Sequence, residues 1–172
     1  ELTRVFNANK LGSMLNLARA EKFYALTERM LEENEKYNLT TQTLAKSEMD
    51  NLHFLPPTRG ILASSFNPEE RHFGVDVTAT NDRNVCSVLD GTILMSGYTA
   101  NNGYVVVVQH VGNLVSVYKH LSSIFKQESV KVKAGEVLGI AGTQGNKIDT
   151  PFLHFELWHK GTALDPTQYI SF

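Results

Sequence analysis

The chain has 172 residues, of which 42% are hydrophobic and 20% are charged, and its formal net charge is −2. This composition excludes a disordered or collagen-like chain, and the near-neutral charge gives no support for binding to nucleic acid or to an anionic membrane. No apolar run reaches the roughly 18 residues that a membrane span needs. The single cysteine, Cys86, can form neither an internal disulfide nor a cysteine-based zinc cluster, so a metal site must use histidine and carboxylate ligands.

The N-terminal third has a helical pattern. Between residues 11 and 37 there is no proline, and apolar residues recur at steps of three to five, which favours an amphipathic helix. A second short helix is predicted over 41–49, and Pro56 and Pro57 then end the periodicity. We therefore expect a helical N-terminal segment over 1–52 and a separate domain over 53–172.

Two interpretations of the N-terminal helix remain open. It could pack on its own domain, or it could be part of a longer helix or coiled coil that positions the domain, binds a partner or pairs two chains. The sequence begins with Glu1, which indicates processing or truncation. A leader, lipid anchor or membrane helix before it therefore stays open.

The rest of the chain has a strand pattern. Residues 104–110 and 114–120 are rich in β-branched and aromatic side chains, and Gly112-Asn113 between them predicts a two-residue hairpin turn. Further short strands are predicted over 130–132, 137–141 and 152–158. Turn signals every 8 to 12 residues indicate a mainly β fold, a small antiparallel sandwich or barrel.

The predicted hairpin separates two of the six histidines. With Gly112-Asn113 as the turn, Val111 would pair with Leu114, and His120 and His110 would fall on opposite faces of the sheet. We therefore expect that His110 and His120 do not share a site. By the same alternation, His159 should point away from His154.

The first chemical motif is His72-Phe73-Gly74-Val75-Asp76. Histidine and aspartate both bind zinc, at about 2.0–2.2 Å. In an extended strand two residues at this spacing would lie about 13 Å apart. The segment must therefore curl if His72 and Asp76 are to share one metal ion, and Gly74 permits this.

The second motif is the predicted strand over 152–158. Period-two alternation places Phe152, His154 and Glu156 on one face, and the apolar residues between them on the other, which we expect to be the core. Considered alone, His154 could equally be a hydrogen-bonded histidine at the core edge.

Several ordered blocks together resemble the LytM-type, M23 family of zinc metallopeptidases, from about residue 57 to 169. The blocks are HFGVD, DGTI at 90–93, YKHLS at 118–122, VKAGEVLGIAGTQG at 132–145, PFLHFELW at 151–158 and LDPTQYI at 164–170. The resemblance implies a small antiparallel β fold. It also implies an extracytoplasmic location in the bacterial cell envelope and hydrolysis of peptide cross-links in peptidoglycan.

The resemblance also implies the site residues. His72, Asp76 and His154 would bind one Zn²⁺ per chain, and His120 would be a catalytic histidine beside the metal. Three protein ligands leave a fourth position open for water, as in catalytic zinc sites. His120 would orient or deprotonate that water or stabilise the oxyanion.

One position departs from the family pattern. The last motif of the family is usually His-x-His, and Phe152 stands at the first histidine. Phenylalanine cannot donate a hydrogen bond or move a proton, and losing one transition-state donor costs roughly 10²–10³ in rate. Glu156 shares the face of His154 but lies on the other side of it from Phe152. It is therefore a poor substitute for the missing histidine.

Three functional hypotheses follow. The first is a zinc endopeptidase of weakened activity, and the second is a zinc-binding but degenerate module that binds or regulates in cell-wall hydrolysis. The third is a lipoyl- or biotinyl-type carrier, which VKAGEVLGI also resembles, although no Met-Lys pair of the carrier kind is present. The peptide bond that is cut and the oligomeric state stay open.

Overall fold

The computed structural model describes residues 49–143 and 150–172. The helix predicted over 11–37 lies outside these residues, as does all but the last residue of the one predicted over 41–49. Within the described ranges, no helix is long and apolar enough to cross a membrane.

The described chain is built from short antiparallel strands, which confirms the mainly β prediction. Three 3-10 turns, η2, η3 and η4, interrupt them. The strands are β1 (Gly60–Ser64), β2 (Val75–Ala79), β3 (Asn84–Cys86), β4 (Gly91–Thr99), β5 (Gly103–Gln109), β6 (Leu114–Ile124), β7 (Lys131–Val132), β8 (Val137–Ala141), β9 (Phe152–His159) and β10 (Thr162–Leu164), and the turns are Pro68–Glu70, Val111–Asn113 and Pro166–Gln168.

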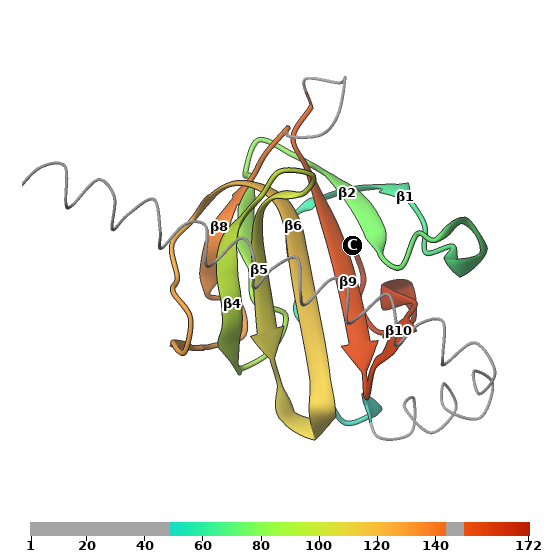
Figure 1. The fold of residues 1–172 in the computed structure, drawn as a ribbon. Coiled ribbons are helices and arrows are strands. Elements are labelled where there is room, and N and C mark those ends of the chain that lie inside the picture. Colours follow the sequence, from blue (N-terminus) through green and yellow to red (C-terminus); the bar gives the residue numbers. More distant parts are fainter. Residues whose placement is uncertain (1–48, 144–149) are drawn as a thin grey trace, which may run out of the picture.

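The long strand β6 lies at the centre of the sheet. The strand order is β1-β2-β9-β6-β5-β4-β7, with β10 beside β9, and β8 joining β3 to β6. Figure 1 shows β9 and β6 side by side, with β2 next to β9. Segments far apart in sequence, β2 and β9, are therefore direct neighbours, which matters for the site.

The predicted hairpin exists, but its predicted register is wrong by one residue. Gln109 pairs with Val115, and His110 donates its backbone N–H to the carbonyl of Leu114. The loop is the three-residue turn η3, in which Gly112 has φ 68° and Asn113 has φ 58°. Gly112 and Asn113 both adopt the left-handed backbone that a tight turn needs. The loop nevertheless has three residues, one more than the predicted two-residue turn.

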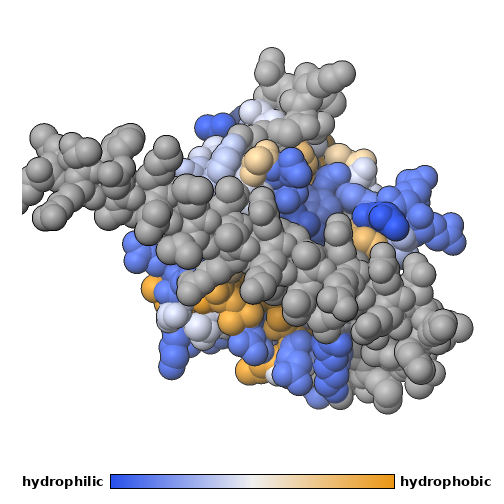
Figure 2. Space-filling model, in the orientation of Figure 1, coloured by the Kyte–Doolittle hydropathy of each residue, from blue (hydrophilic) through white to orange (hydrophobic). Residues whose placement is uncertain are grey.

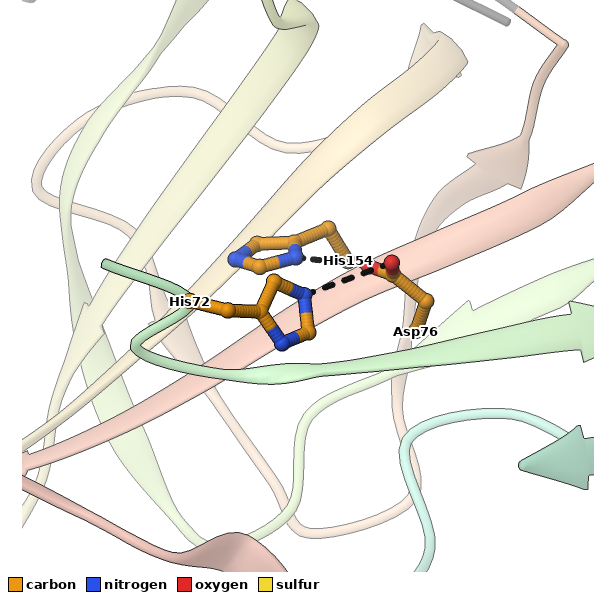
Figure 3. Close-up of side chains that lie close together, drawn as sticks. All are labelled: His72, Asp76 and His154. Atoms are coloured by element: carbon orange, nitrogen blue, oxygen red, sulfur yellow. Dashed lines mark hydrogen bonds and ion pairs between the residues drawn. The ribbon is translucent and has the colours of Figure 1, made fainter. Parts of the chain in front are cut away.

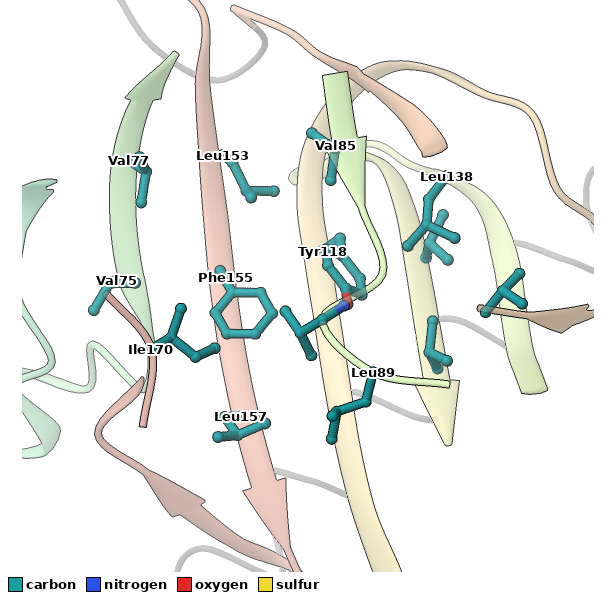
Figure 4. Packing of buried hydrophobic residues seen from close by; sticks show 14 of the residues in the cluster. Val75, Val77, Val85, Leu89, Tyr118, Leu138, Leu153, Phe155, Leu157 and Ile170 are labelled. Carbon is teal, nitrogen blue, oxygen red and sulfur yellow. The ribbon is translucent and has the colours of Figure 1, made fainter. Parts of the chain in front are cut away.

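One face of β6 and β9 forms the main core. Leu153, Phe155 and Leu157 are all 0% exposed, as the alternation in β9 predicted. Figure 4 shows Phe155 beside Tyr118 of β6, and their ring centroids are 5.3 Å apart. The burial of large apolar side chains is the main favourable term in folding. This cluster therefore stabilises the pairing of β9 with β6.

The other face of the same strands carries the polar site residues and a smaller apolar cluster. That cluster consists of Met95, Val105, Val107, Val117, Trp158 and Ala163. Figure 2 shows hydrophobic side chains at several separate places among hydrophilic ones. The most exposed large apolar residues, Ile61 and Val111, belong to different elements, and such scattering is ordinary for a protein surface.

Candidate metal centre

The segment before β2 curls, as the motif required. After η2, Arg71 adopts a left-handed φ of 58°, His72 forms an isolated bridge with Asn67, and the chain bends at Gly74. A Cβ at Gly74 would lie 2.3 Å from the carbonyl oxygen of Phe155. Glycine is therefore needed here because the bend presses the backbone against β9.

Strand pairing brings the two motifs together. Asp76 of β2 lies opposite His154 of β9 in the antiparallel register. Nδ1 of His154 is 2.7 Å from Oδ1 of Asp76, and Nε2 of His72 is 3.3 Å from Oδ2 of the same carboxylate. Figure 3 shows both imidazole rings beside the Asp76 carboxylate. One ligand atom from each of the three residues lies within 4.8 Å of the others.

In each histidine, the ring nitrogen that faces away from Asp76 has a hydrogen-bond acceptor. These nitrogens are Nδ1 of His72 and Nε2 of His154. Nδ1 of His72 is 2.7 Å from the carbonyl oxygen of Ser65, which can only accept, so this nitrogen carries a proton. Nε2 of His154 is 3.1 Å from Oε1 of Glu156. Each ring therefore directs its other nitrogen toward Asp76, as zinc-binding histidines do when a carbonyl or carboxylate holds the outer nitrogen.

One of the two histidine nitrogens that face Asp76 lacks a regular hydrogen bond. Nε2 of His72 is buried and lies 3.3 Å from Oδ2 of Asp76, but it makes no hydrogen bond of regular geometry to any described residue. A buried polar atom left in this way is costly unless something else binds it. Together with the two-histidine, one-carboxylate donor set, this fits a zinc ion held at Nε2 of His72, Nδ1 of His154 and the Asp76 carboxylate.

The charges of the site are strongly coupled. Burial alone would raise the pKa of Asp76, but a hydrogen bond from His154 and the positive charges of His154 and His72 hold it below its usual value. Burial alone would lower the pKa of His154, but the hydrogen bonds to Asp76 and Glu156 raise it above its usual value. In the metal-free protein a proton therefore competes for the His154 nitrogen that faces Asp76.

His120 reaches the site through an irregularity in β6. Regular alternation would place it on the core face with Tyr118, but His120 has φ 64° and the β5–β6 register shifts between Tyr104 and Val106. The ring of His120 consequently lies with its centroid 6.3 Å from that of His154. Left-handed backbone at a residue other than glycine is typical of functional sites.

Phe152 occupies the space beside His120. The two ring centroids are 4.8 Å apart and the rings are tilted by 32°. Gly142 connects the two residues, because its N–H donates to the carbonyl of His120 and its carbonyl accepts from the N–H of Phe152. An apolar ring therefore packs against His120 at the position where the resemblance implies a second histidine.

Sequence reasoning missed an ion pair beside His154. Lys119 of β6 lies opposite His154 in the register, and its ammonium group pairs with the Glu156 carboxylate. Trp158 donates its indole N–H to Oε2 of Glu156 over 2.8 Å. An acidic residue inside an apolar strand was the available signal, since a buried carboxylate requires a charged partner. The partner could not be identified without the β6–β9 register.

The other histidines lie elsewhere. Nδ1 of His110 is 2.8 Å from the carbonyl oxygen of Asp90, and its Nε2 is 2.7 Å from the Ser116 hydroxyl. His110 and His120 thus do not share a site, as expected. His159 ends β9 and is buried, whereas His53 is exposed.

The sequence model of peptidase family M23 matches residues 70–166. The matched range contains His72, Asp76, His120 and His154. The chain belongs to peptidase family M23. Its relatives include one protein named as a murein hydrolase activator and one named as a cell division protein. It is 27% identical over 117 residues to the "Murein hydrolase activator NlpD" of Escherichia coli (strain K12), which is 66% of this chain and 30% of that protein. It is 35% identical over 122 residues to the "Cell division protein DipM" of Caulobacter vibrioides, which is 69% of this chain and 20% of that protein.

The M23 chain therefore spans less than a third of the length of either relative. A third relative, the "DD-carboxypeptidase/endopeptidase Mpg" of Neisseria meningitidis, is 33% identical over 95 residues, covering 55% of this chain and 22% of that protein. Family relatives thus include proteins named as activators and a protein named as an enzyme.

Two solved peptidase structures share the fold. A peptidase M23 structure from Pseudomonas aeruginosa matches with a TM-score of 0.62 and 28% identity, over 69% of this chain and 50% of that one. A zinc-containing peptidase from Vibrio cholerae matches with a TM-score of 0.58 and 26% identity, over 66% of this chain and 39% of that one.

Proposed function

We propose that this M23 chain is a zinc-dependent endopeptidase of the cell envelope that cleaves peptide cross-links of peptidoglycan, with its activity weakened by Phe152. The observation that carries the proposal is the convergence of His72, Asp76 and His154 from two paired strands. Family membership and a relative named as a murein hydrolase activator support a peptidoglycan substrate and an extracytoplasmic location. The predicted division into 1–52 and 53–172 is retained as part of the proposal.

His72, Asp76 and His154 would hold one Zn²⁺. Bound zinc supplies Lewis acidity, which polarises a peptide carbonyl and lowers the pKa of a coordinated water toward about 7. His120 would accept the proton of that water or donate a hydrogen bond to the developing oxyanion, because its ring centroid lies 6.3 Å from that of His154. Asp76 would neutralise part of the ion's charge while keeping both histidines oriented.

Phe152 decides how fast this site works. Its ring is packed against His120 and offers neither a donor nor a base. If the family's second histidine contributes one transition-state hydrogen bond, its replacement costs roughly 10²–10³ in rate. We therefore expect zinc binding with slow hydrolysis.

A second function is favoured by the same residue. A module that binds zinc without turnover would serve as a binding or regulatory domain in cell-wall hydrolysis, and Phe152 in contact with His120 supports this alternative. The E. coli relative is named as an activator of murein hydrolases. In this alternative the N-terminal segment would engage a protein partner.

Digestion of purified peptidoglycan separates the two functions. Wild type, Phe152→His and Asp76→Asn are loaded with zinc, and new peptide ends are counted over time. Slow release by wild type that rises roughly 10²–10³-fold in Phe152→His supports the peptidase. Asp76→Asn is the control and should release nothing above background.

Each other outcome has a clear reading. Inert wild type with an active Phe152→His variant identifies the regulatory module. Rapid turnover by wild type would contradict the role given to Phe152. A wild type that binds no zinc on titration would refute both functions.

A further inference from the structure

Glu156 is the acidic residue of β9, a strand whose other residues are apolar except for two histidines. Glu156 is only 5% exposed, and its carboxylate accepts hydrogen bonds from three donors. Oε1 accepts from Nε2 of His154 and from the Lys119 ammonium, and Oε2 accepts from the Trp158 indole. A carboxylate bonded on both oxygens has no freedom to rotate.

The three donors come from two strands. His154, Glu156 and Trp158 share one face of β9, and Lys119 projects from the facing position of β6. The side chain of Lys119 is 13% exposed, so the ion pair is removed from most solvent. Paired with the Lys119 ammonium, the Glu156 carboxylate is the acceptor for the imidazole N–H of His154.

We propose that Glu156, fixed by Lys119 and Trp158, is a positioning residue that holds the Nε2–H of His154 and thereby keeps Nδ1 directed at the metal position. The inference rests on the proposed zinc site. An imidazole turned by half a rotation about its Cβ–Cγ bond would present a carbon atom where Nδ1 now lies. The hydrogen bond to Glu156 opposes that rotation and fixes which nitrogen keeps its proton.

Lys119 also helps to position His154, because it holds the Glu156 carboxylate in place. Without its ammonium group the buried carboxylate would lose its charge partner, and a buried charge without a partner is strongly unfavourable. Glu156 would then turn toward solvent or draw other donors. Lys119 thus acts on the metal position through Glu156, without facing the Asp76 carboxylate itself.

The test is zinc affinity, measured by competition between the metal-free protein and a chromophoric chelator. Glu156→Gln leaves one acceptor oxygen for three donors, so at least one donor must face an amide group. We expect zinc affinity to fall roughly 10–100-fold, as for other residues that hold a metal-binding histidine. Lys119→Met should weaken binding in the same direction, and Lys119→Arg should restore it.

A matched control exists at a second ion pair. Lys126 pairs with Glu136 away from the candidate metal centre, so Lys126→Met removes the same ammonium group from a pair of the same kind. The zinc affinity of the Lys126→Met variant should equal that of wild type. A merely structural role for Lys119 would lower the unfolding midpoint without changing zinc affinity, so both quantities are measured for each variant.

A spectroscopic readout complements the affinity. In ¹H–¹⁵N spectra of the zinc-loaded wild type, the imidazole Nε2–H of His154 should give a slowly exchanging signal, and Glu156→Gln should lose it. Zinc affinities equal to wild type in Glu156→Gln and Lys119→Met would overturn the inference alone. Absence of zinc binding by wild type would overturn the proposed function as well. If Glu156→Gln does not fold, the Lys119→Met and Lys119→Arg pair decides.

Discussion

At the scale of single residues, Asp76 is the centre of the candidate site. It contacts a histidine through each of its oxygens and contributes the site's formal negative charge on β2. Asp76→Asn removes that charge and places an amide between two imidazoles. We expect zinc affinity to fall by more than the roughly 10–100-fold typical of residues that act behind a metal ligand. Chelator competition measures this.

Asp165→Asn is the matched control for that substitution. Asp165 is the N-cap of η4 and accepts hydrogen bonds from the N–H and hydroxyl of Thr167. Asparagine caps a helical turn about as well as aspartate, so both stability and zinc affinity should stay near wild type. A zinc affinity that is unchanged in Asp76→Asn would remove Asp76 from the ligand set.

His110 illustrates a buried histidine that serves the fold. Burial lowers its pKa below the usual value, and the backbone hydrogen bond to Asp90 opposes this only in part. The unfolded chain therefore binds more protons here than the folded protein once the pH falls below about 6.5. The contribution of His110 to the free energy of unfolding should thus decrease as the pH is lowered from 7.5 to 5.5.

The pH effect is isolated by comparison with His110→Asn. The raised pKa of His154 acts in the opposite direction in metal-free protein, but it is common to both chains. Urea unfolding at the two pH values should show a larger loss of stability for wild type than for His110→Asn. Equal losses would show that His110 does not carry the effect.

At the scale of elements, the site depends on how closely the bend before β2 approaches β9. A Cβ at Gly74 would meet both the Phe155 carbonyl at 2.3 Å and Cγ of Glu156 at 2.9 Å. Gly74→Ala must therefore move backbone next to His154. We expect a loss of about 1–3 kcal/mol in the free energy of unfolding, as for other overpacked sites, and weaker zinc binding.

Gly112→Ala separates this close approach from a general cost of replacing glycine. Gly112 has φ 68°, but no atom lies within 4 Å of the position of an added Cβ. The left-handed backbone should cost about 1–2 kcal/mol in the same urea titration. Zinc affinity should not change. Weakened zinc binding in both variants would mean that stability, and not the β2–β9 approach, controls the site.

The elements also show what the sequence can predict. Alternation alone placed His154 and Glu156 on one face of β9 and Phe155 in the core, because β9 is regular throughout. The position of His120 could not be derived in this way, because it depends on the bulge in β6. The predicted hairpin register was wrong for a related reason. Gly112-Asn113 is compatible with a two-residue and with a three-residue loop, so these residues alone do not determine the loop length.

Lys119 marks a further limit of sequence reading. Its role depends on a partner 37 residues away on another strand, and that pairing appears only when β6 and β9 are in register. The motif residues were easier to find because their chemistry is local. The resemblance to the family supplied His120, which neither periodicity nor spacing would have selected among the six histidines.

At the scale of the whole molecule, the sheet separates stability from chemistry. One face of β6 and β9 packs the main core, while the opposite face carries His154, Glu156 and the residues that reach toward them. The metal position joins β9 to β2 and to the curled segment before it. An ion bound there would cross-connect parts of the chain that are about 80 residues apart in sequence.

Zinc should therefore stabilise the folded protein by mass action. An ion that binds only the folded state, present at 100 times its dissociation constant, adds about 2.7 kcal/mol to the free energy of unfolding. For a chain of this size we expect Tm to rise by about 5–10 °C. Thermal unfolding of metal-free protein with and without zinc measures the shift. Asp76→Asn should show a much smaller shift, so an equal shift in both proteins would place the bound zinc elsewhere.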